Sequence, residues 1–188
     1  KRIYQQSMYA LSPKIKSEGD IIRISPLDGM EYFFGYYDKS PWDATDRYML
    51  CIKAKDTYSE VAPKTEAEIV LFDTYNNSCR ILGKTNSWNV QQGCMIQWLG
   101  PDFSEKIIYN DFRDNHYCSV ILNINTSVEK VLPLPVYSVS HDGRFALSLD
   151  FSRLHRLRKG YGYSNLPDTT KDEKCPDKVC IWYRSEEH

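Results

Sequence analysis

A polar turn leads directly into an apolar run at Ser140-His141-Asp142-Gly143-Arg144-Phe145-Ala146-Leu147. Asp-Gly is favoured in tight turns because glycine accepts the positive φ that such turns need. Two other stretches, 40–50 and 100–109, have the same order: a turn with proline, an acidic residue, a basic residue and a strand-like run. This repeated order predicts antiparallel strands joined by short turns.

A second repeated unit has the order strand, polar turn, strand. It covers residues 67–82 and 118–132, and a third version is expected at residues 178–183. Aligned on Arg47, Lys106 and Arg144, the first set of copies is spaced by 59 and 38 residues. These intervals bracket the roughly 40 to 50 residues of a four-stranded propeller blade. The excess in the first interval is the polar stretch 53–66, which predicts a long loop between two strands.

The repeat resembles that of TolB-like and oligogalacturonate-lyase-like β-propellers, whose signature is Ser-Pro-Asp-Gly-Lys/Arg before an apolar strand. The stretch from Ser140 to Arg144 matches the signature best, and the resemblance extends over about residues 33–188. It implies an all-β fold, a β-propeller of four-stranded blades with about three blades present. The expected division is a lead-in segment at 1–32 and blades at about 33–85, 86–134 and 135–188.

Three blades do not close a ring. The expectation is therefore that the chain is about half of a six- to seven-bladed propeller, or that a second chain completes the ring. The composition agrees with an all-β class, because aromatic residues are frequent in strands and make up 13% of the chain, including 14 tyrosines.

The charge balance excludes some partners. The formal net charge is -1, so no long-range field would draw the chain onto nucleic acid. No apolar run approaches the roughly 20 residues that span a bilayer, so no membrane span is expected. Six scattered cysteines favour a reducing, cytoplasmic compartment, whereas their even number and two Asn-X-Ser/Thr sequons leave a secreted or periplasmic location open.

Polar residues in loops that enter the innermost strands of a propeller would line its central funnel. Tyr37, Asp38 and Lys39 lie in one such stretch, and Gln91 and Gln92 lie in another. Burial of an amide is costly unless it is hydrogen-bonded, so the glutamines either face a ligand or are simply solvated in the loop, and both interpretations are open. For the tyrosine, packing at the rim of the core is the alternative.

The segment 110–117 is rich in hydrogen-bonding side chains and lies between two expected strands. Arg113 could bind a carboxylate or phosphate through its planar fork, and His116 could act as a base or a ligand. The alternative is a solvated hairpin loop.

The densest group of cations lies at residues 150–163. Five potentially cationic side chains occur within seven residues, namely Arg153, His155, Arg156, Arg158 and Lys159. Tyr161 follows them. Arginine forks recognise planar anions such as uronates, sulfates or phosphates, and tyrosine faces stack on rings. The alternative is a surface loop whose basic residues pair with acidic residues elsewhere in the chain.

The tyrosine content and the basic cluster, together with what the resemblance implies, predict that the funnel binds an anionic oligosaccharide, as part of a polysaccharide lyase or hydrolase. In an elimination at a uronate, Arg156 would neutralise the carboxylate, and His155 or Tyr161 would take the proton. Arg153 and Arg158 would join the residues named above in binding the substrate.

The competing prediction is a non-catalytic scaffold for a protein partner, with Trp42, Trp88 and the stretch 53–66 as contact elements.

The resemblance also implies a divalent metal held by histidine and glutamine. The candidates are Gln91 or Gln92 with His116 or His155, and no spacing in the sequence assigns the metal.

Overall fold

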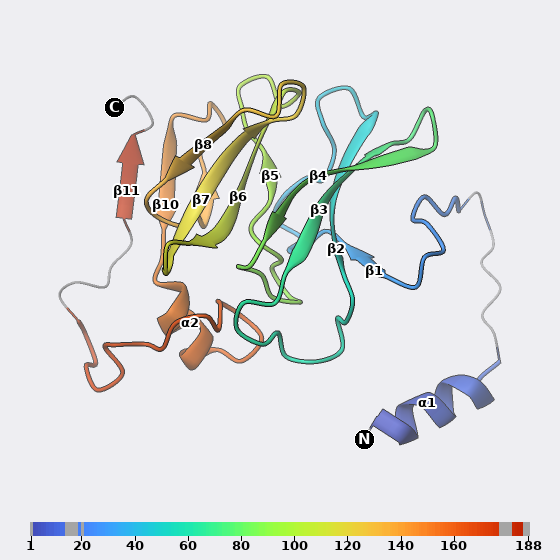
Figure 1. Ribbon diagram of the computed structural model, residues 1–188, viewed down its shortest axis with the longest axis horizontal. Coiled ribbons are helices and arrows are strands. Elements are labelled where there is room, and N and C mark those ends of the chain that lie inside the picture. The colour runs from blue at the N-terminus through green and yellow to red at the C-terminus, as the bar shows by residue number, and fades with distance from the viewer. Residues whose placement is uncertain (1, 14–18, 20, 177–181, 186–188) are drawn as a thin grey trace.

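The computed structural model describes residues 2–13, 19, 21–176 and 182–185 (Figure 1). Its strands form three antiparallel sheets, and each sheet consists of strands that are consecutive in the sequence. The first sheet has the order β1 (Glu31–Phe33), β2 (Tyr48–Ala54), β3 (Ala67–Asp73) and β4 (Ser78–Thr85). The second has the order β5 (Gln97–Trp98), β6 (Lys106–Arg113), β7 (His116–Asn123) and β8 (Glu129–Leu132). The third contains β9 (Ser138–Val139), β10 (Phe145–Ser148) and β11 (Trp182–Ser185).

The predicted turns and strands of the repeats are confirmed. Strands begin at or directly after the three basic residues Arg47, Lys106 and Arg144. Residues 55–66 connect β2 to β3, as the polar composition of the stretch 53–66 predicted, and the first two residues of that stretch belong to β2. Of the third strand unit, expected at 178–183, residues 178–181 lie outside the described residues, and β11 begins at Trp182.

The prediction of a β-propeller is wrong. The three sheets are neither curled nor closed, and they lie in a sandwich-like arrangement. The physical reason is that the turn-and-strand repeat specifies only the pairing of neighbouring strands within a sheet. Sandwiches and propellers share that pairing, and the packing of one sheet on another decides between them. The expected funnel and the expected completion of a ring by further blades or a second chain are withdrawn with the propeller.

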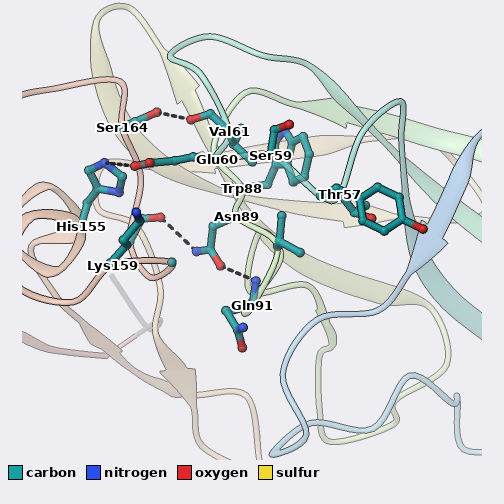
Figure 2. Close-up of a pocket in the computed structure, with 14 residues that line it drawn as sticks. Thr57, Ser59, Glu60, Val61, Trp88, Asn89, Gln91, His155, Lys159 and Ser164 are labelled. Atoms are coloured by element: carbon teal, nitrogen blue, oxygen red, sulfur yellow. Dashed lines mark hydrogen bonds and ion pairs between the residues drawn. The ribbon is translucent and has the colours of Figure 1, made fainter. Parts of the chain in front are cut away.

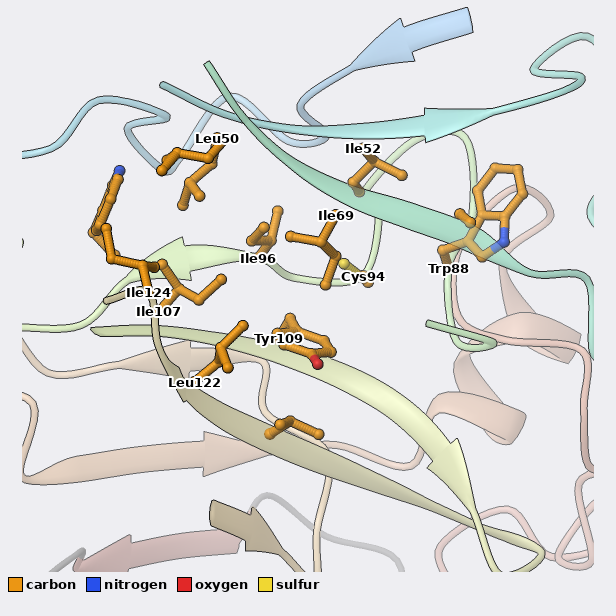
Figure 3. Close-up of a cluster of buried hydrophobic side chains, with 14 of the residues drawn as sticks. Leu50, Ile52, Ile69, Trp88, Cys94, Ile96, Ile107, Tyr109, Leu122 and Ile124 are labelled. Carbon is orange, nitrogen blue, oxygen red and sulfur yellow. The ribbon is translucent and has the colours of Figure 1, made fainter. Parts of the chain in front are cut away.

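The largest hydrophobic core joins the first two sheets (Figure 3). Ile52 and Ile69 of the first sheet and Ile107 and Tyr109 of the second are all buried in it. The side chains that point to one face of a strand recur at every second residue, and this alternation places Ile107 and Tyr109 together. The indole of Trp88 closes one end of the cluster and donates a hydrogen bond to the carbonyl of Thr65 at 2.8 Å.

A second core covers the opposite face of the second sheet. Ile108 and Tyr117 pack there with Phe151 and Tyr163, whose rings are stacked with centroids 4.4 Å apart. Phe151 begins the helix α2 (Phe151–Leu157), which the sequence analysis did not predict. The second sheet is therefore covered on both faces, and the segment 150–163 is part of the packed body.

A second helix, α1 (Arg2–Leu11), precedes the sheets and was likewise not predicted. Neither helix among the described residues is long and apolar enough to cross a bilayer.

Candidate functional site

Three segments that are far apart in the sequence meet beside the C-terminal end of α2. The hydroxyl groups of Tyr36 and Tyr161 are 3.3 Å apart. Gly160 lies against Gln91, because a Cβ at Gly160 would be 3.5 Å from Cγ of that glutamine. Gly35 lies close to Gln92, the residue after Gln91. A Cβ at Gly35 would be 2.8 Å from the carbonyl oxygen of Gln92. The structure thus brings together parts of three stretches from which the sequence analysis selected residues, and Tyr36, next to the selected Tyr37, provides the contact from the first of them.

Asn89 holds two of these segments in place. Its Oδ1 accepts hydrogen bonds from the backbone N–H groups of Gln91 and Gln92, at 2.9 and 2.7 Å. Its Nδ2 donates to the carbonyl of Gly162 at 3.0 Å (Figure 2). The sequence analysis missed this residue, although an asparagine two residues before a polar pair is a recognised signal for a side-chain-stabilised turn.

The helix α2 divides the basic stretch into residues within the helix and residues that follow it. Asp150 caps α2 by accepting a hydrogen bond from the N–H of Arg153 at 2.9 Å. Because α2 ends at Leu157, Arg153 and Arg156 are separated by one helical turn, whereas Arg158 and Lys159 follow the last turn. The five cations therefore do not form one surface.

Arg153 and Arg156 are used within the chain. Arg156 Nε donates to Oδ2 of Asp168 at 2.7 Å, and Arg153 Nη1 lies 3.7 Å from the same oxygen. Arg153 also donates to the carbonyls of Thr170 and Glu173, each at 3.0 Å. The Asp168 side chain is fully buried. Burial acts to raise its pKa, but hydrogen bonds from Arg156 and Thr170 prevail and lower the pKa to about 2. This is the pairing that the sequence analysis named as the alternative to ligand binding.

A pocket of about 250 Å³ lies next to the meeting point of the three segments. Its walls come from the turn at 88–91, the end of α2 with residues 159–164, and residues 57–61 of the loop between β2 and β3 (Figure 2). Hydrogen bonds attach that loop to the segment after α2. Ser164 Oγ donates to the carbonyl of Val61 at 2.8 Å, and the N–H of Lys64 donates to Asn165 Oδ1 at 2.6 Å.

His155 lines this pocket with two hydrogen-bond acceptors at its ring. Its Nδ1 is 3.3 Å from the carbonyl oxygen of Tyr161, and its Nε2 is 3.5 Å from a carboxylate oxygen of Glu60. A carbonyl oxygen faces Nδ1 and a carboxylate oxygen faces Nε2. Neither a carbonyl nor an ionised carboxylate can donate a hydrogen bond, so the imidazole would have to donate from both nitrogens to bond to both groups. Lys159 also lines the pocket and is exposed. Within the described part of the chain it has no ion pair.

Tyrosine rings border this region. Tyr36 and Tyr37 have centroids 4.4 Å apart, and Tyr161 meets Tyr36 edge-on at 6.0 Å. The hydrogen bond between the Tyr36 and Tyr161 hydroxyl groups contributes most to raising the pKa of Tyr36. The guanidinium of Arg158 lies 4.1 Å from the ring centroid of Tyr161 and donates to its hydroxyl at 3.2 Å. Tyr37 is 86% exposed, so its ring is available to a ligand.

The remaining predicted residues lie elsewhere. Asp38 and Lys39 line a different pocket. Arg113 forms ion pairs with Asp111 and Glu129, each at 2.8 Å, across the edge of the second sheet. Gln92 is buried, and neither polar atom of its amide has a hydrogen-bond partner among the described residues.

Of the proposed metal ligands, Gln91 and His155 line the same pocket, whereas Gln92 and His116 do not line it. His116 is exposed at the start of β7, with its Nδ1 3.3 Å from the carbonyl of Asp114. His155 makes the contacts with Tyr161 and Glu60 given above. Among the residues that the structure describes, there is no group of three or more His, Cys, Asp or Glu side chains placed to hold a metal ion.

Comparisons of the chain with protein-family models, with curated proteins and with solved structures give no match. The resemblance to the TolB-like and oligogalacturonate-lyase-like repeat stays a prediction.

Proposed function

We propose that the pocket beside the end of α2 binds an acidic sugar, as one residue of an anionic oligosaccharide. The observation that carries this proposal is that Lys159 lines a small pocket, while Arg158 on the ring of Tyr161 and the Tyr36–Tyr37 pair lie beside it. A pocket of about 250 Å³ suits one ring better than several.

The cations would hold the acidic group. Lys159 has three N–H donors on a side chain that no carboxylate neutralises among the described residues. Arg158 uses one N–H on the Tyr161 hydroxyl, which fixes its side chain and leaves other donors of its fork for a carboxylate or sulfate. The exposed face of Tyr37 would pack on the apolar face of an adjoining sugar ring.

The proposal is confined to binding. Arg156, which an elimination would need at the substrate carboxylate, is held by Asp168. His155 has acceptors at both ring nitrogens, and a general base needs a free lone pair within reach of the substrate.

The alternative of a scaffold for a protein partner is less well supported by the geometry. Trp88, one of its expected contact elements, is only 3% exposed and belongs to the core. The 53–66 loop is attached to the segment after α2 and forms a wall of the pocket. Trp42 is partly exposed, but it lines the other pocket.

The test is calorimetric titration of the full chain with oligomers of galacturonic acid, and with a neutral glucan of equal length. Arg158→Met and Lys159→Met, singly and together, remove the two cations without shortening the apolar parts of the side chains. A hydrogen bond to a charged group contributes about 1.5–3 kcal/mol, so each variant should weaken binding by roughly 10- to 100-fold. The matched control is Lys130→Met, which removes an exposed cation on β8.

Saturable binding of the acidic oligomer that the control retains and the double variant loses would support the proposal. Failure of the wild-type chain to bind the acidic oligomer would overturn it, and so would equal binding by the double variant.

A further inference from the structure

A second, larger pocket of about 460 Å³ lies between the chain that precedes β2, the second sheet and the third sheet. The chain before β2 provides Lys39 and Trp42, β5 provides Gln97 and Trp98, and the end of β9 with the following turn provides His141. Neither the acidic-sugar site nor the cations after α2 include any of these side chains.

Lys39 is the unusual group in this pocket. Its side chain is only 8% exposed, and a buried ammonium needs nearby partners to offset the loss of water. One partner is the Asp38 carboxylate, which accepts its hydrogen bond at 2.9 Å. The ring of Tyr137, with its centroid 5.8 Å from Nζ, is another. An ammonium has three N–H groups, and within the described chain Asp38 accepts the one hydrogen bond that Lys39 Nζ makes.

The acidic groups of the pocket argue against an anionic ligand. Asp38 is 43% exposed beside the ammonium. Asp43 also lines the pocket, and its carboxylate accepts hydrogen bonds from the N–H groups of Arg47 and Tyr48 and from the hydroxyl of Thr45. Two carboxylates next to one ammonium give the pocket no excess of positive charge. The Lys39 ammonium and the Asp38 carboxylate, 2.9 Å apart, nevertheless provide a hydrogen-bond donor and an acceptor side by side.

The other walls are aromatic and held in place. Trp98 donates from its indole to the carbonyl of Pro41 at 2.9 Å. The rings of Phe103 and His141 lie with centroids 4.9 Å apart. Trp42 is 37% exposed, so part of its indole is free to meet a ligand. Gln97 adds an amide whose Nε2 donates to the carbonyl of Met95 at 3.3 Å.

We propose that this second pocket binds a neutral sugar ring. Each hydroxyl group of a sugar both donates and accepts, so two adjacent hydroxyls match a side-by-side ammonium and carboxylate without a net charge on the ligand. The C–H face of the same ring is apolar and flat enough to pack on the exposed part of Trp42. The proposal is independent of the acidic-sugar site, because the two pockets share no residue.

The experiment titrates the full chain with glucose, galactose and mannose and follows tryptophan fluorescence, since Trp42 and Trp98 line the pocket. At least one hexose should give a saturable change, confirmed by calorimetry. Cyclohexanol, which has a ring of the same size and a single hydroxyl, should bind at least tenfold more weakly. Glucuronate should bind more weakly than glucose, because its carboxylate would meet Asp38.

Lys39→Met and Asp38→Asn each remove one member of the pair and should weaken hexose binding at least tenfold. The control Lys130→Met should leave it unchanged. Asp38 and Trp42 are partly exposed, so Asp38→Asn and Trp42→Ala keep the test available if Lys39→Met fails to fold.

Absence of a saturable signal with all three hexoses would overturn the proposal, and so would hexose binding that both pair variants retain. Stronger binding of glucuronate than of glucose would also overturn it. Loss of acidic-oligomer binding in Arg158→Met with hexose binding retained would show that the two sites are separate.

Discussion

Replacement of Asp168 by alanine should destabilise the fold strongly, although the residue lies in an irregular segment near the C-terminal end of the described chain. Its carboxylate is fully buried and accepts four hydrogen bonds or ion pairs. Oδ2 receives Arg156 at 2.7 Å and lies 3.7 Å from Arg153, and Oδ1 accepts from the N–H and the hydroxyl of Thr170, each at 2.8 Å. Alanine would leave both guanidinium groups without their acidic partner.

Removal of one partner from a buried ion pair typically costs about 3–5 kcal/mol. Arg153 and Arg156 are 15% and 38% exposed, so water can partly replace the lost carboxylate, and the lower end of that range, about 3 kcal/mol, is expected. For a chain of 188 residues, 1 kcal/mol corresponds to roughly 2–4 °C in the midpoint of thermal unfolding. The variant should therefore unfold about 6–12 °C below the wild type.

The assay is urea and thermal unfolding followed by circular dichroism. Asp172→Ala is the matched control, because Asp172 is exposed in the same segment and should change stability by less than about 0.5 kcal/mol. In a double-mutant cycle, Asp168→Ala and Arg156→Ala should be coupled by about 1–3 kcal/mol. If Asp168→Ala is no more destabilising than the control, and the cycle shows no coupling, the assignment of Arg153 and Arg156 to an internal role is refuted.

Three further outcomes follow from the same contacts. The pKa of Asp168 is lowered from 3.8 to about 2 in the folded state, so its stabilising contribution should be complete above about pH 4 and be lost as the pH falls toward 2. Hydrogen bonds also lower the pKa of Asp73 and Asp142, so urea unfolding should show a smaller decline in Asp168→Asn than in the wild type. Gly162→Ala should cost roughly 1–3 kcal/mol in urea unfolding and displace His155, because Gly162 has φ +66° and a Cβ there would overlap the carbonyl of Phe151 and the backbone nitrogen of His155. Burial raises the thiol pKa of three cysteines, to about 12 for Cys51 and Cys94 and about 11 for Cys118. Iodoacetamide should therefore label the exposed Cys79 and Cys175 in the native chain and leave those three unlabelled, as peptide mass spectrometry would check; labelling of Cys94 without unfolding would contradict its burial.

The strands were predictable because their signals are local. A turn residue followed by a basic residue and an apolar run specifies where a strand begins, and Arg47, Lys106 and Arg144 mark three such places. The packing of one sheet on another was not predictable from those signals. It depends on which face of each strand is apolar and on what covers it, and β6 is buried on both faces, with Ile107 in one core and Ile108 in the other.

The candidate site was predictable in its residue types but not in its grouping. Tyr36, Gln91 and Tyr161 are drawn together by Asn89 and by glycines at which the backbone of one segment approaches another. Such contacts between distant segments have no signature in the neighbouring sequence. The burial of Gln92 could not be predicted from the sequence for the same reason, because the distant Gly35 lies against its backbone.

The length of one helix explains why the basic stretch divides between two roles. Composition alone treats its five cations as equivalent, whereas seven residues of helix starting after Asp150 give each of them a direction. Arg153 and Arg156, three residues apart, lie on one face and reach the same carboxylate. Arg158 comes after the last helical residue, so it leaves that face and lies on the ring of Tyr161. A helix one turn longer would have placed it elsewhere, so the end of α2 at Leu157 is what leaves a cation beside the proposed acidic-sugar pocket.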